Sequence, residues 1–257
     1  MERPQPTVNK QLNGGVIPRS IWIRTICRKN GRDLTDDQIR LLEKYVALLL
    51  EWNTKINLIS RRDVDNIWSS HIVHSIVPMF KIDLCDQATV LDLGSGGGLP
   101  GIPWRILLPT ISVTMVDATQ KKVNAVLSML KELGLSNISA AWGRAEELGR
   151  SAQFHKKFDY VVARGVGPLD ELAKLAQPFL RRRKIGETQE GKRPTPRVPA
   201  LLAFKGGEIE VEVGRTKRLK SVESVETILL NFVGSEETDL TGKKLVVVSF
   251  DHSKETP

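Results

Sequence analysis

The sequence contains few cysteines, few aromatic residues (5%) and no long apolar run. Its two cysteines, Cys27 and Cys85, are too few for a disulfide framework or a zinc cluster, so we expect both to be small apolar residues in a reducing compartment. No segment approaches the roughly 20 consecutive apolar residues that span a bilayer, and the N-terminal segment lacks the apolar centre of a secretory signal. We therefore expect a cytoplasmic protein with no membrane segment.

Histidine is also scarce, which limits metal binding. His71 and His74 lie three residues apart on a predicted helix and offer two possible ligands. No third ligand with suitable spacing accompanies them. We expect no metal site, and we expect the 257 residues to bury a core without one.

The net charge of +8 is concentrated in two segments. Residues 1–32 carry a net charge of +6 and residues 181–200 carry +5, which leaves the rest of the chain close to neutral. We expect a flexible basic tail over 1–32 and, because of its Gly, Pro and charge content, a basic loop insertion over 181–200. Such segments attract phosphate at long range, although basic tails also simply keep proteins soluble. An organellar transit segment is a further alternative for the N-terminal residues within 1–32.

Apolar residues recur at helical intervals between residues 33 and 86. Thr35 and Gln38 have the spacing of a capping box, which predicts that the first helix begins there. We assign Asp63 as the N-cap of a second helix that ends before Pro78. The pattern predicts a helical N-terminal extension.

From residue 87 to 250 short apolar strands alternate with helices. We expect strands over 88–94, 111–117, 137–142, 158–164, 200–207 and 243–250, with helices over 102–108, 121–133 and 169–180. This order predicts an α/β fold of the doubly wound, Rossmann-like kind, with a mostly parallel sheet covered on both faces. Residues 33–250 then form a single domain, comprising the helices of 33–86 and the core of 87–250.

The strongest local pattern is a glycine loop directly after the first of these strands. Gly94, Gly96 and Gly98 let the chain turn tightly and let a ligand approach the backbone. Asp92 lies just before the loop. Asp117 ends the next strand, about 20 residues beyond the loop, where a carboxylate can bind a ribose diol. The spacing predicts a nucleotide-type cofactor.

Two cofactors and one structural alternative fit this loop. A dinucleotide places its pyrophosphate on the free N–H groups of a helix N-terminus, whereas S-adenosylmethionine has a cationic sulfonium and a charged amino-acid end. Asp92 suits that positive charge and repels a pyrophosphate, and Pro100 and Pro103 remove N–H donors from the following helix. We favour S-adenosylmethionine over a nicotinamide dinucleotide or a purely structural turn.

Further motifs cover most of the chain, from about residue 33 to 250. They are WNTKINL at 52–58, Arg62-Asp63, His71, Ser75-Ile76, DLGSGGGLPGIP at 92–103, Asp117, Lys121–Val123, GRAEE at 143–147, Val162–Arg164 and Phe204–Gly206. Together they resemble the RsmG (GidB) family of small-subunit rRNA methyltransferases. The resemblance implies S-adenosylmethionine-dependent methylation of guanine N7 in the decoding-region loop of bacterial-type 16S rRNA.

The resemblance also implies roles for individual residues. Gly94 and Leu99 line the cofactor pocket, and Asp117 holds the ribose. Ala145 and Glu146 lie beside the adenine. Arg164 lies at the junction of cofactor and substrate. Three positions depart from the family pattern, namely Ser70, His74 and the start of the last strand at Lys243–Leu245.

The implied reaction needs positioning rather than a general base, because guanine N7 has a lone pair and no proton. Arg164 is therefore the one candidate catalytic residue. Arg144, Arg164, Lys205 and His71 are candidate RNA contacts, since guanidinium groups stack on bases and bind phosphates. The alternatives are structural ion pairs for the arginines, a solvated lysine, and packing for His71.

We expect a monomer whose partner is 16S rRNA or the small ribosomal subunit. A methyltransferase of the same fold that acts on another RNA or on a protein is the main alternative. A non-catalytic RNA-binding or ribosome-binding protein is the second, although the intact glycine loop argues against it.

Overall fold

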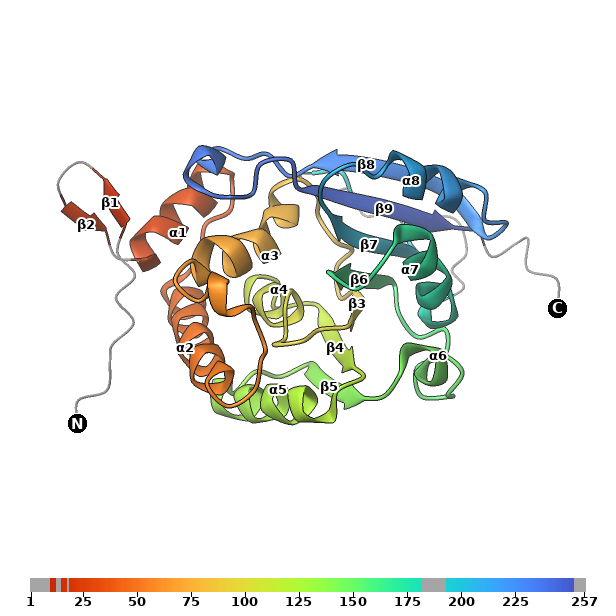
Figure 1. Cartoon of the computed structure of the whole chain (residues 1–257), viewed down its shortest axis with the longest axis horizontal. Coiled ribbons are helices and arrows are strands. Elements are labelled where there is room, and N and C mark those ends of the chain that lie inside the picture. Colours follow the sequence, from red (N-terminus) through yellow and green to blue (C-terminus); the bar gives the residue numbers. More distant parts are fainter. Residues whose placement is uncertain (1–9, 13–14, 18, 182–192, 252–257) are drawn as a thin grey trace.

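Seven strands form the central sheet of the computed structural model, which describes residues 10–12, 15–17, 19–181 and 193–251. The order in the sheet is β5-β4-β3-β6-β7-β9-β8 (Figure 1). The strands are β3 (Thr89–Leu93), β4 (Ser112–Asp117), β5 (Ile138–Trp142), β6 (Tyr160–Arg164), β7 (Ala200–Lys205), β8 (Val222–Leu229) and β9 (Lys244–Phe250). The five strands from β5 to β7 are parallel, and β9 is antiparallel to both of its neighbours. The predicted mostly parallel sheet is confirmed.

The strand order is related to that of dinucleotide-binding proteins but differs at one edge. Numbered by their own chain order, these strands run 3-2-1-4-5-7-6. The dinucleotide-binding order is 3-2-1-4-5-6. Here the last strand, β9, lies between β7 and β8 and is antiparallel to both. This edge of the sheet is therefore an antiparallel pair rather than a parallel strand reached by a crossover.

Alternate residues of the central strands point into two apolar layers. Val90 and Val162 pack on the side of α2 (Asp36–Asn53), α4 (Gly101–Leu107) and α5 (Gln120–Leu133). Leu91 and Val161 pack on the side of α6 (Ala145–Leu148), α7 (Leu169–Ala176) and α8 (Glu210–Lys217). Strands covered on both faces are apolar at most positions, which is why these strands appear as short apolar runs in the sequence, interrupted in β3 by the buried Asp92.

Two C-terminal elements, α8 and β8, are absent from the sequence prediction. β8 lies at the sheet edge and alternates mostly exposed and half-buried residues, with only Val222 buried. An edge strand with one neighbour buries little apolar surface and so gives a weak apolar pattern. The short 3-10 turns lie at Arg61–Asp63, Val77–Phe80, Gln177–Phe179 and Ser235–Glu237.

The predicted capping box is confirmed, whereas the predicted second helix is broken. Thr35 Oγ1 accepts the Gln38 N–H at 3.2 Å, and Gln38 Oε1 accepts the Thr35 N–H at 3.0 Å. The assignment of Asp63 as an N-cap is wrong, because Ser60 caps the 3-10 turn that ends at Asp63. A wider π-helical turn (Trp68–Val73) then leads into α3 (His74–Ile76).

The expectation of a flexible basic tail over 1–32 is wrong for residues 19–32. β1 (Lys10–Leu12) and β2 (Gly15–Ile17) pair as a hairpin, and α1 (Arg19–Lys29) follows. α1 buries an apolar stripe of four residues, Trp22, Ile23, Ile26 and Cys27. The high basic content hides this helical spacing. Residues 1–9 lie outside the described residues.

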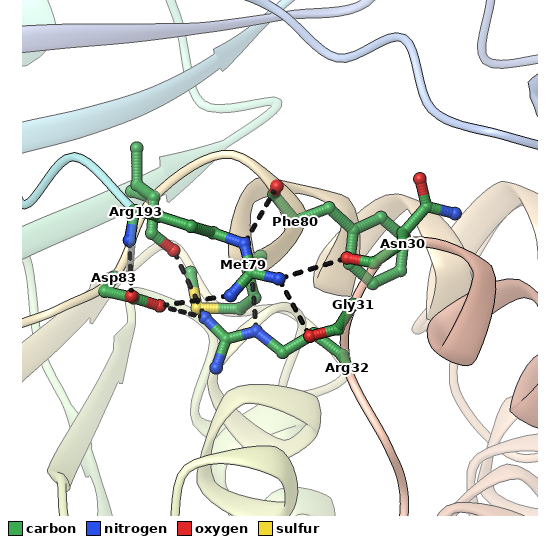
Figure 2. A network of polar contacts seen from close by, with 8 residues as sticks. Asn30, Gly31, Arg32, Met79, Phe80, Asp83 and Arg193 are labelled. Atoms are coloured by element: carbon green, nitrogen blue, oxygen red, sulfur yellow. Dashed lines mark hydrogen bonds and ion pairs between the residues drawn. The ribbon is translucent and has the colours of Figure 1, made fainter. Parts of the chain in front are cut away.

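Two arginines from the basic segments point inward and share one carboxylate (Figure 2). Arg32 and Arg193 both pair with Asp83, the latter with an Nη1–Oδ1 distance of 3.6 Å. Arg193 also donates to the carbonyls of Phe80 and Gly31, at 3.2 and 2.8 Å. This Asp83 network joins the end of α1, the turn before β3 and the segment before β7.

Other basic residues of 181–200 also have structural partners. Arg181 Nε lies 3.1 Å from Asp159 Oδ1, and Arg197 pairs with Glu223. In residues 193–199, the two arginines are paired with carboxylates. This part of the predicted basic loop therefore does not present free positive charge to a phosphate. Residues 182–192 lie outside the described residues, and a loop there stays a prediction.

None of the described helices is long and apolar enough to cross a membrane. Within the same residues, no group of three or more His, Cys, Asp or Glu side chains is placed to hold a metal ion. Cys27 and Cys85 are both free and buried, as the sequence predicts, and burial raises the pKa of the Cys27 thiol to about 12.

Replacing Asp83 with alanine should destabilise the fold by about 2–3 kcal/mol, because it leaves two half-buried guanidinium groups without their carboxylate. The side chains of Arg32 and Asp83 are 22% and 19% exposed, so the loss should fall below that of a fully buried pair. Urea unfolding measures the change. Asp33→Ala, which removes the exposed partner of Arg28, is the control and should have little effect. Equal losses in the two variants would contradict a structural role for the Asp83 network.

Candidate active site

The carboxyl ends of β3, β4 and β6 meet at the centre of the sheet (Figure 1). The chain crosses from β3 to β4 on one side, and β6 lies against the other side of β3. Ligands bind at such a reversal in strand order in open parallel sheets. The fold therefore brings together three predicted site regions: the glycine loop, Asp117 and Arg164.

The glycine loop adopts backbone conformations that other residues rarely take. Gly94, Gly96 and Gly98 have φ values of +72°, +56° and +93°. A Cβ added at Gly94 would lie 2.7 Å from a Val166 methyl, and one at Gly98 would lie 2.5 Å from Ile102 Cδ1. The backbone angle therefore favours glycine at these positions, and a larger residue would also have to displace the Val166 or Ile102 side chain.

The N-terminal helices support this loop directly. The Tyr45 hydroxyl, on α2, donates to the Gly97 carbonyl at 2.9 Å and is fully buried. A Cβ at Gly97 would lie 2.7 Å from Leu49 Cδ1 on the same helix. In the sequence, Tyr45 and Leu49 are simply two of the apolar residues that recur at helical intervals between residues 33 and 86. A tyrosine among such residues is the available signal, because its buried hydroxyl needs a partner.

Asp117 joins the loops that follow β3 and β4. Its Oδ2 accepts the Gly96 N–H at 3.0 Å, and its Oδ1 accepts the Thr119 N–H at 2.8 Å. A carboxylate has about four lone-pair sites, so these two bonds leave acceptor capacity on both oxygens. Asp117 is half-buried at the strand end, in a position suited to a ribose diol.

The N–H groups at the start of α4 are already used within the chain. Asp92 Oδ2 accepts the Gly101 N–H at 2.8 Å, and the Gly98 carbonyl accepts the Ile102 N–H at 2.8 Å. Pro103 has no N–H, and the Trp104 N–H donates into the first turn. A pyrophosphate binds helix N-termini through free N–H groups, so this geometry argues against a dinucleotide.

Asp92 is fully buried behind the glycine loop. Burial raises the pKa of its carboxyl to about 7, although the Gly101 hydrogen bond and Arg164 oppose that shift. Its Oδ1 has no hydrogen-bond partner among the described residues. A buried carboxylate with an unused oxygen is stabilised by a nearby positive charge, which S-adenosylmethionine carries.

Arg164, at the end of β6, extends toward the N-terminal extension. Its Nη2 lies 3.1 Å from His71 Nδ1, and His71 Nε2 lies 3.4 Å from Asp63 Oδ2. Burial lowers the pKa of the Arg164 guanidinium, while Tyr45, Asp92 and Asp63 act in the opposite direction. The structure thus places two predicted RNA contacts, His71 and Arg164, against each other.

Both histidines near Arg164 are neutral at physiological pH. Burial, followed by Arg164, lowers the pKa of His71 to about 4, against the opposing effect of Asp63. Burial and the charges of Arg164 and Lys243 lower the pKa of His74 to about 3. The His74 ring packs edge-on against Phe204, with a centroid distance of 5.3 Å.

The residues predicted beside the adenine lie at the start of α6. Arg144 is the N-cap of this helix, Ala145 is half-buried, and Arg144 and Glu146 are exposed. Trp142, at the end of β5, is 57% exposed, and its Nε1 donates to the Ala118 carbonyl at 3.1 Å. Sequence analysis does not select Trp142, because a tryptophan at a strand end gives no signal of its own.

Two further predicted residues are less open than expected. Leu99 is only 3% exposed and packs in the core behind the glycine loop. Lys205 Nζ lies 2.7 Å from Glu212 Oε2 and donates to the Gly167 carbonyl at 2.6 Å. Lys205 thus has a structural ion pair, and its contact with RNA stays a prediction.

The site fits S-adenosylmethionine by the chemistry of its polar groups. Gly94 and Gly96 are only half-buried, Asp117 keeps acceptor capacity for a diol, and Asp92 has one oxygen without a hydrogen-bond partner among the described residues. The start of α4 offers nothing to a phosphate. These features match a cationic nucleoside without phosphate.

Gly98→Ala should destabilise the protein more than Gly134→Ala. Both glycines have positive φ, which costs an alanine about 1–2 kcal/mol. Only Gly98 adds a clash, with the fully buried Ile102, which should cost about 1–3 kcal/mol more. The Gly134 site is open. Thermal and urea unfolding measure both variants, and equal losses would mean that Ile102 moves aside.

Comparison with known proteins gives consistent relatives. Residues 38–241 match the family model described as rRNA small subunit methyltransferase G. Proteins named Ribosomal RNA small subunit methyltransferase G are 32% identical in Lactococcus lactis subsp. lactis (strain IL1403), over 87% of each chain, and 35% identical in Chlorobaculum tepidum, over 86% of this chain and 94% of that protein. The protein of that name from Porphyromonas gingivalis (strain W83) is 38% identical, over 70% of this chain and 75% of its own length.

The matched region contains the glycine loop, Asp117, Arg164 and the N-terminal helices that contact them. The sequence motifs, the sheet order and these relatives agree. The chain belongs to the rRNA small subunit methyltransferase G family.

Proposed function

We propose that this protein transfers the methyl group of S-adenosylmethionine to N7 of one guanine in the decoding-region loop of 16S rRNA. The choice of cofactor rests on the start of α4. There the Gly101 N–H already donates to Asp92, so it is not free to bind a phosphate. Membership of the family supports the choice of substrate. The alternatives are the outcomes of the experiment below.

The residues proposed to hold the cofactor surround the carboxyl ends of β3, β4 and β5. The bound cofactor supplies an electrophilic methyl group on its sulfonium. Asp92 provides negative charge behind the loop, and Asp117 binds the ribose. The remaining proposed cofactor residues are Gly94, Gly96, Gly98, Leu99, Ala145, Glu146 and Arg164.

The chain contributes alignment rather than proton transfer. Guanine presents N7 and O6 as adjacent acceptors on one edge, and an arginine recognises that edge by donating to it. We infer that Arg164 donates to O6, which leaves the N7 lone pair free to attack. Holding the reacting atoms in line supplies the rate enhancement. Neutral His71 and His74 are suited to such a site, because the methylated guanine is itself cationic.

The proposed partner is the small ribosomal subunit or its naked 16S rRNA. Arg144 is exposed beside the cofactor residues of α6 and is free to meet a phosphate or a base. We propose action as a monomer in the cytoplasm, where its ribosomal substrate is found.

The direct test is transfer of radiolabelled methyl to small subunits and to naked 16S rRNA from cells that lack the modification. N7-methylguanine permits backbone cleavage, which maps the product. One cleavage in the decoding-region loop is expected. Labelling without that cleavage would indicate that another base or atom is methylated. Labelling only of other RNAs or of proteins would show that the substrate is not 16S rRNA. Binding of rRNA with no labelling of any substrate would favour a non-catalytic protein.

Replacing Arg164 with alanine should lower the rate of methyl transfer about 100-fold or more, because the guanine then loses its alignment. The dissociation constant for S-adenosylmethionine should change much less than the rate, because Arg164 is only one of the residues proposed to border the cofactor. Arg150→Ala, an exposed arginine after α6, is the control and should retain activity. A fully active Arg164 variant would remove Arg164 from the site.

S-adenosylmethionine affinity should rise about tenfold between pH 6 and pH 8. The raised pKa of Asp92, about 7, means that the free protein holds a proton below that pH, and a cationic ligand must displace it. S-adenosylhomocysteine has the same amino-acid end without the sulfonium charge, so its affinity should rise less. Calorimetry at several pH values measures both, and parallel curves for the two ligands would contradict a role for Asp92.

A further inference from the structure

We propose that Asp63 and His71 form a positioning chain for Arg164, so that His71 acts through Arg164 and does not itself contact RNA. The inference rests on the proposed function, in which Arg164 aligns the target guanine. Its structural basis is a line of three side chains from three separate segments. They are the turn at Arg61–Asp63, the π-helical turn at Trp68–Val73 and the end of β6.

Arg164 depends on His71 for its orientation. Its Nη2–His71 Nδ1 contact, at 3.1 Å, is the only side-chain hydrogen bond recorded for Arg164 within the described residues. No carboxylate in that part of the chain lies within ion-pair distance of it, although Asp92 and Asp63 contribute at longer range. A guanidinium has five N–H donors in a fixed plane, so one bond to a rigid ring sets the direction of the others.

The partner atoms fix the tautomer of His71. Arginine has only donors, so His71 Nδ1 must be the unprotonated acceptor and the ring proton must be on Nε2. Nε2 lies 3.4 Å from Asp63 Oδ2 and makes no hydrogen bond of good geometry, so the carboxylate acts on the ring electrostatically across this short distance. A carboxylate on one ring nitrogen makes the other a better acceptor, which strengthens the Arg164 contact.

The burial of the three groups gives the chain a direction. The Asp63 side chain is 40% exposed and the His71 side chain 13%, while Arg164 is half-buried at the strand end. The charge of Asp63 thus stays partly hydrated at the surface and acts on Arg164 through a buried ring. Protonated His71 would point an N–H at the guanidinium, so the contact requires the neutral ring.

The π-helical turn is consistent with this role. Such turns are rare and occur often at functional sites, because the extra residue per turn redirects one side chain. Here the turn includes His71. The His71 ring lies between Asp63, on the preceding 3-10 turn, and Arg164, at the end of β6. A simple packing role for His71 would not need this pair of polar contacts.

The test compares variants in two backgrounds. Asp63→Ala and His71→Leu should each lower kcat for methyl transfer to small subunits about 10- to 100-fold, with little change in the dissociation constant for S-adenosylmethionine. In an Arg164→Lys background the same changes should have less than a twofold effect, because the group they position is gone. Asp65→Ala, an exposed aspartate in the same connection, is the matched control and should match the wild type.

Two further measurements separate positioning from folding. His71→Asn keeps an acceptor near the position of Nδ1 and should recover part of the activity that His71→Leu loses. The guanidinium NMR signals of Arg164 should show restricted rotation in the wild type and faster rotation in His71→Leu, whether or not any RNA is methylated.

The outcomes distinguish the two proposals. Equal effects in the Arg164 and Arg164→Lys backgrounds, or full activity of Asp63→Ala, would overturn the positioning chain and leave the proposed function intact. Unchanged Arg164 signals in His71→Leu would also overturn it. A wild-type protein that labels no 16S rRNA would instead overturn the proposed function.

Discussion

The hydrogen bond from the Gly101 N–H to the buried Asp92 carboxylate constrains the whole site. It joins the end of β3 to the first residue of α4, so it fixes the span of the glycine loop between them. Gly101 must be glycine because a Cβ there would lie 2.8 Å from Asp92 Oδ2. The same contact satisfies the helix N-terminus from inside the protein. Loop geometry and the preference for a cationic ligand over a phosphate therefore have one physical origin.

The N-terminal helices belong to the site rather than forming an appendage. Tyr45 on α2 holds the glycine loop by its Gly97 carbonyl, and His71 reaches Arg164 at the end of β6. The Tyr45 contact is buried and the His71–Arg164 contact is partly buried, and an unpaired polar group at either place is costly, so each side depends on the other. The N-terminal helices thus contact the strand ends of the sheet, at the glycine loop and at Arg164.

Several basic side chains of this fold are paired with carboxylates inside the structure. Arg32 and Arg193 converge on Asp83 (Figure 2). Arg181 reaches Asp159, and Lys205 is paired with Glu212. These cations join distant segments, since buried guanidinium groups need several acceptors and so collect carbonyls and carboxylates around them. Among the described residues near the site, Arg144 is an exposed basic side chain.

The sequence by itself determined the central strands, the start of α2 and the chemistry of the loop. Strands buried on both faces require mostly apolar residues, the left-handed backbone positions favour Gly94 and Gly98, and the Thr35–Gln38 capping box is a local contact. Only the tertiary structure decided the partners of the long polar side chains, such as Asp63–His71–Arg164 and Lys205–Glu212. Those contacts join residues with no fixed sequence spacing, so no local pattern encodes them. The formation of helix α1 and of edge strand β8 was also decided by the tertiary structure, because both pack against elements elsewhere in the chain.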